Sequence, residues 1–267
     1  MIPKVIHYCW FGGNPLPELA VKCINSWKRY FPDFEIKEWN ESNFDLDCCD
    51  YVREAYQAKR WAFVSDYARF WILYNHGGLY FDTDVEVIRS FDDILDQGPF
   101  MGCESVGQCA PGLGLGTPAG LAIYKEILDF YEGRHFLKAD GELDVTTVVE
   151  YTSDILMRHG WILKNEIQNV EGIHIYPSSY FCPMDYDTGK INLAENTHSI
   201  HHYTASWCGN YGRRITELHR ICLNCFGQEI GYKIARVLDF PLRIMNSIEQ
   251  RGFGGSVKFA LRKLRNG

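Results

Sequence analysis

The sequence predicts an α/β protein built on a parallel sheet, followed by a helical C-terminal extension. Residues 5–11 form an apolar, strand-length segment, residues 16–27 repeat apolar side chains at helical spacing, and residues 34–39 alternate as a strand does. This β-α-β order is typical of parallel strands joined by crossover helices. After about residue 212 the pattern becomes helical and basic. We therefore expect a body over residues 1–212 and an extension over residues 213–267.

The remaining elements follow in the same α/β pattern. Residues 55–75 predict one long helix rich in aromatic side chains, ended by the glycines of His76-Gly77-Gly78. Residues 79–81 predict a short buried strand that leads into Asp82. Residues 107–120 are rich in glycine and predict a flexible loop, not a phosphate loop, since no Gly-Lys-Ser/Thr follows. Further extended segments are expected at 85–88, 99–103, 172–177 and 198–203, and helices at 119–131 and 146–159.

The composition is that of a globular protein with an uneven distribution of charge. The 267 residues are 46% hydrophobic and 15% aromatic, which excludes a disordered chain. The formal net charge is −7, which argues against nucleic-acid binding by the chain as a whole. Residues 232–267 carry a net +6, so the first 231 residues carry −13. An acidic body therefore precedes a basic end.

The cysteines indicate the redox compartment of the protein, and the lengths of the apolar runs indicate whether the chain could span a membrane. The ten cysteines are spread over a long chain in which we see no signal peptide, which favours reduced, buried thiols. Cys222 and Cys225 have the spacing of half a zinc site, but no second pair accompanies them. No apolar run approaches the ~20 residues that a membrane-spanning helix needs.

Asp82-Thr83-Asp84 is the strongest local signal for chemistry. In an extended segment, residues i and i+2 point to the same side, so both carboxylates can face one site. Two such carboxylates suit a hard divalent cation that also holds phosphate oxygens. The alternative is a solvated turn without a ligand.

Asp66 and Arg69 lie three residues apart inside the predicted helix and share a face. Their neighbours are apolar nearly all round, which indicates that this helix is largely buried. The pair is therefore either an intrahelical ion pair of little energetic weight or the polar floor of a pocket. A fixed carboxylate and a guanidinium group are well suited to binding sugar hydroxyls.

Histidines and one tryptophan complete the candidate site. His198, His201 and His202 cluster near Trp207, and adjacent residues of a strand point to opposite faces. At most one of His201 and His202 is therefore expected to join the carboxylates. Two carboxylates with one imidazole favour manganese or magnesium. Trp10, at the end of the first strand, is either a core residue or a stacking surface for a planar base.

These segments together resemble glycosyltransferase family 32, whose sugar-binding region carries an Asp-x-Asp motif. The resemblance covers roughly residues 1–210 and is most specific from Ser65 to Asp84. The family includes fungal α-mannosyltransferases and bacterial capsule or glycolipid enzymes, and it is similar to the glucosylating domains of clostridial toxins. The segments that carry the resemblance are Ile6–Gly13, Val64–Phe70, Asn75–Asp84 and His201–Trp207.

The resemblance implies a GT-A fold with a Rossmann-like nucleotide-sugar-binding sheet, Mn²⁺ or Mg²⁺ as cofactor, and retention at the anomeric carbon. It implies that a hexose or N-acetylhexosamine moves from a nucleotide sugar, with UDP as the default base. By position, the metal ligands are Asp82, Asp84 and His202, and the catalytic residues are Asp66, Arg69, Asp82, Asp84 and Trp207. The donor-binding residues are Trp10, Phe11, Gly12, Ser65, Asp66, Arg69, Asp82, Thr83, Ser206 and Trp207.

The C-terminal end predicts a basic amphipathic helix. Phe253, Val257, Leu261 and Leu264 fall on one face, and Lys258, Arg262 and Arg265 fall on another. Such a helix either packs on the body or attaches to an anionic membrane surface. The second interpretation predicts a cytoplasmic enzyme, peripheral on the inner leaflet, with a lipid-linked glycan or glycolipid acceptor. Two alternatives stay open: a metal-dependent phosphoesterase acting on nucleotide sugars, and a non-catalytic carbohydrate-binding protein.

Overall fold

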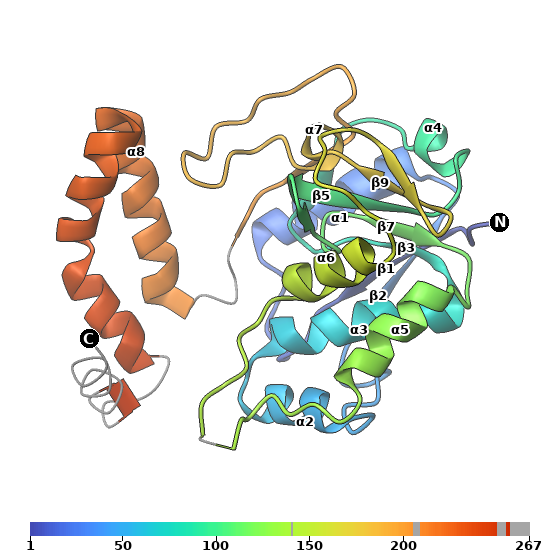
Figure 1. Ribbon diagram of the computed structural model, residues 1–267, viewed down its shortest axis with the longest axis horizontal. Helices are drawn as coiled ribbons and strands as arrows, with labels where there is room; N and C mark the ends of the chain where they lie inside the picture. The colour runs from blue at the N-terminus through green and yellow to red at the C-terminus, as the bar shows by residue number, and fades with distance from the viewer. Residues whose placement is uncertain (140, 205–208, 250–254, 257–267) are drawn as a thin grey trace. The chain divides into compact units, whose positions relative to one another are not determined.

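The computed structural model describes residues 1–139, 141–204, 209–249 and 255–256, and these fall into two compact units. The first unit comprises residues 1–183 and 192–202 and is the α/β body (Figure 1). The second comprises residues 184–191 and 203–267, and its described part is mainly helical. The expected basic amphipathic helix lies in 250–267, almost wholly outside the described residues.

The body alternates strands and helices through most of its length. Its first half contains β1 (Val5–Cys9), α1 (Glu18–Tyr30), β2 (Glu35–Trp39), α2 (Asp50–Gln57), α3 (Trp61–His76), β3 (Gly78–Tyr80), β4 (Val85–Val87) and α4 (Asp92–Leu95). Its second half contains β5 (Phe100–Ser105), β6 (Gln108–Cys109), β7 (Leu115–Thr117), α5 (Ala122–Tyr131), α6 (Val148–Arg158), β8 (Gln168–Val170), β9 (Ile173–Tyr176), α7 (Ser178–Phe181) and β10 (Ser199–His201).

The central sheet confirms the α/β class and shows that the strands are mixed in direction. Its order is β2-β1-β3-β7-β5-β9-β8, with β6 paired to β5. Strand β1 is parallel to both β2 and β3, as the β-α-β pattern predicts. Strand β7 is antiparallel to β3 and β5, so the mostly parallel sheet includes an antiparallel strand that the β-α-β pattern did not indicate. A second sheet pairs β4 with β10 antiparallel.

The helices of the body position the chain that leads to the Asp-x-Asp segment. Helix α3 packs against β1 and β3, and α2 and α5 pack against α3 (Figure 1). The single helix expected over residues 55–75 is two helices, because Lys59 adopts a left-handed backbone (φ 57°) between α2 and α3. At the other end of α3, Gly77 (φ 63°) ends the helix as the sequence predicts.

The glycine-rich segment is part of the folded core and not a flexible loop. Residues 109–117 are buried, and this stretch includes β7. A Cβ atom on Gly116 would lie 2.2 Å from the ring of Phe100, and one on Gly114 would lie 2.9 Å from the ring of Phe81. Glycine is therefore needed here because aromatic rings of the core pack directly on the backbone.

The helical unit is a hairpin of two arms. Helix α8 runs over Gly209–Leu238 with a non-helical Gly227 (φ 75°), and residues 240–249 are also helical. The arms touch closely, since a Cβ atom on Gly231 would lie 2.8 Å from Cα of Leu223. The side chain of His219 contacts that of Asp239 across the hairpin at 2.7 Å. Among the described residues, no helix is long and apolar enough to cross a membrane.

Candidate active site

The residues with the strongest chemical signal meet where β3 leaves the central sheet. Asp66 and Arg69 come from α3, and their side chains form an ion pair of 2.9 Å. Asp82 follows β3, and its Oδ1 lies 3.3 Å from the same Arg69 Nη2 atom. The predicted proximity of the α3 pair is confirmed, and one guanidinium group links both acidic positions.

The α3 pair is deeply buried, which excludes a solvent-exposed intrahelical ion pair. The side chain of Arg69 is 5% exposed and that of Asp66 is 13% exposed. Burial raises the pKa of the Asp66 carboxyl to about 7, although the charge of Arg69 opposes this shift. A carboxyl group with so high a pKa inside a protein is typical of functional sites.

Asp82 is held by three neighbours while part of its carboxylate stays accessible. The Tyr80 hydroxyl donates to Asp82 Oδ1 at 3.0 Å, and the Asp82 N–H donates to the Gly112 carbonyl at 2.9 Å. A Cβ atom on Gly112 would lie only 1.9 Å from Asp82 Oδ2. The side chain of Asp82 is 31% exposed, so this carboxylate is fixed in position and still open to a ligand.

Asp84 is separated from Asp82 by a turn and has different partners. The Val85 N–H donates to the Asp82 carbonyl at 3.0 Å, so residues 82–85 turn and are not extended as the sequence reasoning assumed. The Asp84 carboxylate lies 3.3 Å from His201 Nε2 on β10. Burial disfavours the charged imidazole, yet the adjacent Asp84 carboxylate raises the pKa of His201 well above its usual value.

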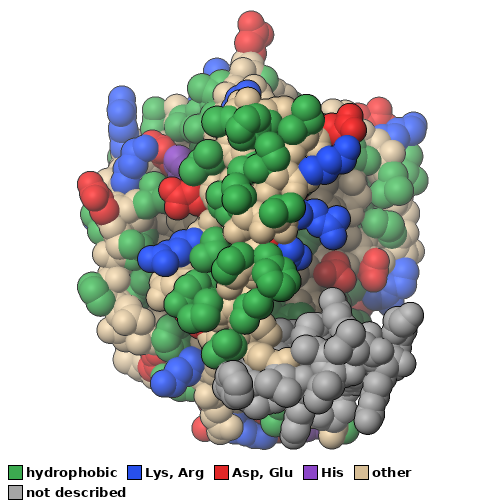
Figure 2. All heavy atoms as spheres, turned by 90° about the vertical axis from the view of Figure 1, so that its left-hand side faces the viewer, with side chains coloured by type: hydrophobic (Ala, Val, Ile, Leu, Met, Phe, Trp, Pro, Cys, Tyr) green, Lys and Arg blue, Asp and Glu red, His purple; other side chains and the backbone are tan. Residues whose placement is uncertain are grey.

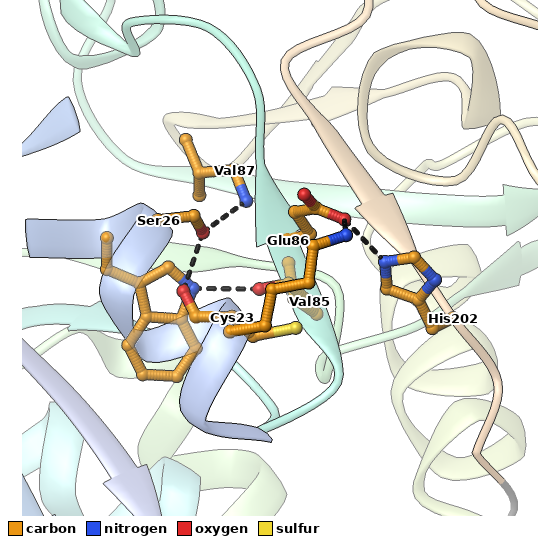
Figure 3. A network of polar contacts seen from close by, with 8 residues as sticks. Cys23, Ser26, Val85, Glu86, Val87 and His202 are labelled. Carbon is orange, nitrogen blue, oxygen red and sulfur yellow. Dashed lines mark hydrogen bonds and ion pairs between the residues drawn. The ribbon is translucent and has the colours of Figure 1, made fainter. Parts of the chain in front are cut away.

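His202, the predicted third metal ligand, contacts a different acid. Its Nε2 lies 2.8 Å from Glu86 Oε2, and Lys22 contacts the same oxygen at 2.7 Å (Figure 3). The surrounding contacts tie β4 to α1, because the Ser26 hydroxyl accepts from the Val87 N–H and the Trp27 indole donates to the Val85 carbonyl. His198 instead contacts Asp93 at 3.0 Å.

Within the described ranges, no group of three or more His, Cys, Asp or Glu side chains is arranged to hold a metal ion. Oxygens of Asp82 and Asp84 suit a hard cation, but water or phosphate oxygens would have to complete its coordination shell. The role of His202 as a ligand stays a prediction.

The predicted donor-binding residues at the end of β1 divide between surface and core. Trp10 is half-buried, and its indole donates to the Asn14 carbonyl at 2.6 Å. Phe11 is buried against Phe44, with 5.8 Å between ring centroids, so its side chain belongs to the core. A Cβ atom on Gly12 would lie 2.7 Å from the Trp61 indole. The structure thus accounts for Phe11 and Gly12 by packing.

Four other predicted positions remain, which are Ser65, Thr83, Ser206 and Trp207. The Ser65 hydroxyl donates to the Trp61 carbonyl within α3, and the Ser65 carbonyl accepts from Arg69 Nε at 3.1 Å. Thr83 lies half-buried in the turn between the two aspartates. Ser206 and Trp207 lie outside the described residues.

Sequence reasoning did not assign Tyr80 or Gly112 to the site, and it chose His202 over His201 as the histidine that joins the carboxylates. The alternation of glycines over 112–116 was the available signal for a segment packed against the site, and the adjacency of His201 to His202 left the choice between them open. The deciding fact is the pairing of β10 with β4, in which His201 lies opposite Val85, the residue after Asp84.

Comparisons with known proteins relate part of the chain to a known family. Residues 17–101 match the family described as "Glycosyltransferase sugar-binding region containing DXD motif", a range that contains Asp66, Arg69, Asp82 and Asp84. This segment is similar to that family, in agreement with the resemblance found in the sequence.

Two fission-yeast proteins are similar to the chain over a longer range. "Inositol phosphoceramide mannosyltransferase 3" of Schizosaccharomyces pombe is 27% identical over 180 residues, covering 65% of this chain and 48% of that protein. "Inositol phosphoceramide mannosyltransferase 1" of the same organism is 28% identical over 152 residues, covering 51% and 46%. The chain thus spans about half the length of these curated relatives.

Among solved structures, "PaToxG Glycosyltransferase" aligns with a TM-score of 0.43 at 15% identity, covering 59% of this chain and 68% of that one.

Proposed function

We propose that this protein is a metal-dependent, retaining glycosyltransferase with a GT-A fold that transfers a hexose or N-acetylhexosamine from a nucleotide sugar. The observation that carries the proposal is the buried Asp66–Arg69–Asp82 arrangement inside the segment that matches the DXD family. A phosphoesterase needs carboxylates for a metal, but it does not need a buried carboxylate and guanidinium group beside them. Such a pair is suited to holding the hydroxyls of a sugar.

The exposed carboxylate of Asp82, together with Asp84, would hold Mn²⁺ or Mg²⁺ and the donor diphosphate. A divalent cation held by these residues would offset the negative charge that develops on the leaving phosphate. Asp66 and Arg69 would bind the donor sugar and keep it oriented as it becomes oxocarbenium-like. Trp10 is the candidate for stacking on the base, UDP being the default carrier. Ser206 and Trp207 remain the candidates for closing over the diphosphate.

No described residue is required as a nucleophile in this proposal. In a front-face reaction, the acceptor hydroxyl attacks the anomeric carbon on the side that the diphosphate leaves. Its proton passes to the departing phosphate oxygen, so retention needs positioning and charge stabilisation only.

The acceptor is proposed to be a lipid-linked glycan or glycolipid at the inner leaflet of a membrane. The names of the fission-yeast relatives include an inositol phosphoceramide, which is a lipid acceptor of this class. The basic residues of 250–267 provide charge for an anionic surface, at about 1 kcal/mol for each basic residue near it. Deletion of 250–267 is expected to weaken binding to anionic vesicles, and unchanged binding would remove this segment from the proposal.

A screen of nucleotide sugars with and without Mn²⁺ tests the proposed reaction. We expect metal-dependent release of nucleoside diphosphate from one donor, and transfer of its sugar to an added glycolipid acceptor. Release of sugar phosphate would indicate a phosphoesterase instead. Binding of sugar without turnover of any donor would indicate a carbohydrate-binding protein.

A further inference from the structure

The second arm of the helical unit, residues 228–249, carries large apolar side chains on the side that faces solvent. Val237 is 74% exposed and Phe240 is 61% exposed. Ile230, Val237 and Ile244 recur every seven residues, so they lie along one side of the arm. We call this side the apolar face; its exposed members are Ile230, Val237, Leu238, Phe240, Ile244 and Met245.

Figure 2 shows hydrophobic side chains gathered in a strip, with Lys, Arg, Asp and Glu side chains on either side of it. Single exposed apolar residues are common on soluble proteins, but a continuous strip with a polar rim marks an interaction surface. The apolar face therefore needs an occupant.

The opposite side of the same arm carries small and charged residues together with Tyr232, whose ring lies 6.2 Å from that of His219 on the first arm. Ala235 is fully buried, and Gly231 lies against the backbone of Leu223. Asp239 is 2% exposed and pairs with His219 of the first arm and with Arg243 of its own arm, each at 2.7 Å. This distribution differs from that of an ordinary surface helix, because several of the large apolar side chains of the arm stay exposed. Small contact residues, with polar side chains holding the helices together, are typical of helices that pack in lipid.

Charge distinguishes between the two possible occupants, a lipid surface and a second copy of the chain. Lys233 and Arg236 are exposed on the same arm, where Lys233 also pairs with the exposed Glu229 at 3.0 Å. Residues 251–267 contain five Lys and Arg residues and no Asp or Glu. Anionic headgroups complement this charge, whereas a second copy of the chain would carry the same basic charge.

We propose that the apolar face inserts into the interfacial region of an anionic phospholipid membrane, with Lys233 and Arg236 contacting headgroups. A helix with an apolar face and basic margins binds in the plane of the interface and does not span the bilayer. This surface would hold the protein at the membrane that contains the proposed acceptor. It does not depend on glycosyl transfer, since lipid binding can be measured without a sugar nucleotide.

The test is flotation of the full chain with vesicles of equal parts phosphatidylcholine and phosphatidylglycerol. Val237→Ser/Ile244→Ser is expected to lower partitioning to these vesicles at least about tenfold, because two side chains lose their apolar contact. Leu163→Ser/Leu193→Ser, which changes two similarly exposed leucines of the body, is the matched control and should bind as the unaltered protein does. Pure phosphatidylcholine vesicles should bind the protein weakly.

Two results would overturn the inference. One is vesicle binding by Val237→Ser/Ile244→Ser that equals that of the control. The other is a protein that is dimeric by light scattering and becomes monomeric on these substitutions, which would identify a second copy as the occupant. Donor turnover in solution should be the same in both double variants, so a failed lipid assay and a failed transfer assay remain distinguishable.

Discussion

The α/β body and the helical unit each reverse the usual distribution of polar and apolar groups, but in opposite directions. The body buries the carboxyl group of Asp66 and the guanidinium group of Arg69 in an interior that is rich in aromatic side chains. The helical unit leaves Val237 and Phe240 in solvent and buries Asp239. Either reversal costs stability in water. The difference indicates what each region contacts: polar groups inside the body suit a polar ligand, whereas apolar groups outside the helical unit suit an apolar surface.

The largest expected effect is that of Asp84→Asn on turnover. Loss of one anionic metal and diphosphate ligand should lower metal-dependent release of nucleoside diphosphate by roughly 10³-fold or more. The measurement is donor turnover at saturating Mn²⁺, with Asp129→Asn on the surface of α5 as the control. Turnover close to that of the control would show that the body's acids are structural.

Removal of the guanidinium group should have the largest effect on stability. Arg69→Leu leaves the carboxylates of Asp66 and Asp82 without their shared partner, which should cost about 3–5 kcal/mol in the free energy of unfolding. Urea unfolding measures this loss. The double variant Asp66→Asn/Arg69→Leu should recover part of it, and no recovery would mean that the two side chains are not coupled.

Asp66 predicts a pH dependence of stability in the metal-free protein. Its folded-state pKa of about 7 lies above the ordinary value of 3.8, so between these values the native state holds a proton that the unfolded chain has released. Stability relative to Asp66→Asn should therefore fall as the pH rises from about 4 to 7, by up to about 4 kcal/mol, and then level off. Thermal unfolding of both proteins across this range is the measurement, and a constant difference between them would contradict it.

Gly112→Ala tests how tightly the core holds Asp82. The added methyl group would displace the Asp82 carboxylate, and we expect turnover to fall about 10–100-fold while the fold persists. Gly13→Ala serves as the comparison, because nothing lies within 4 Å of its Cβ position and only its positive φ is strained. Equal activity in the two variants would show that the position of Asp82 is not critical.

The smallest effect is expected for an ion pair in solvent. Lys125 pairs with Asp129 at i,i+4 on the exposed side of α5. Lys125→Gln should shift the midpoint of thermal unfolding by no more than about 1–2 °C. A shift as large as that of Arg69→Leu would remove the distinction between buried and exposed pairs.

Local patterns were sufficient to predict the first three elements of the body. Apolar spacing predicts β1, α1 and β2, and the spacing of Asp66 and Arg69 places them together on α3. The antiparallel insertion of β7 could not be predicted, since Gly114 and Gly116 indicate a loop until the rings of Phe81 and Phe100 are known to pack on them. The partner of Asp84 depends on the register of β10 against β4, which no nearby sequence signal encodes.

The turn at residues 82–85 joins two separate sheets, and this has a consequence for how the site responds to perturbation. Contacts with Arg69 and Tyr80 fix the Asp82 carboxylate relative to the central sheet. The contact with His201 fixes the Asp84 carboxylate relative to the small β4–β10 sheet. The distance between the two carboxylates therefore depends on the position of one sheet relative to the other. A substitution in α1 at Ser26 or Trp27, which anchor β4, would alter the spacing of the carboxylates without touching either one.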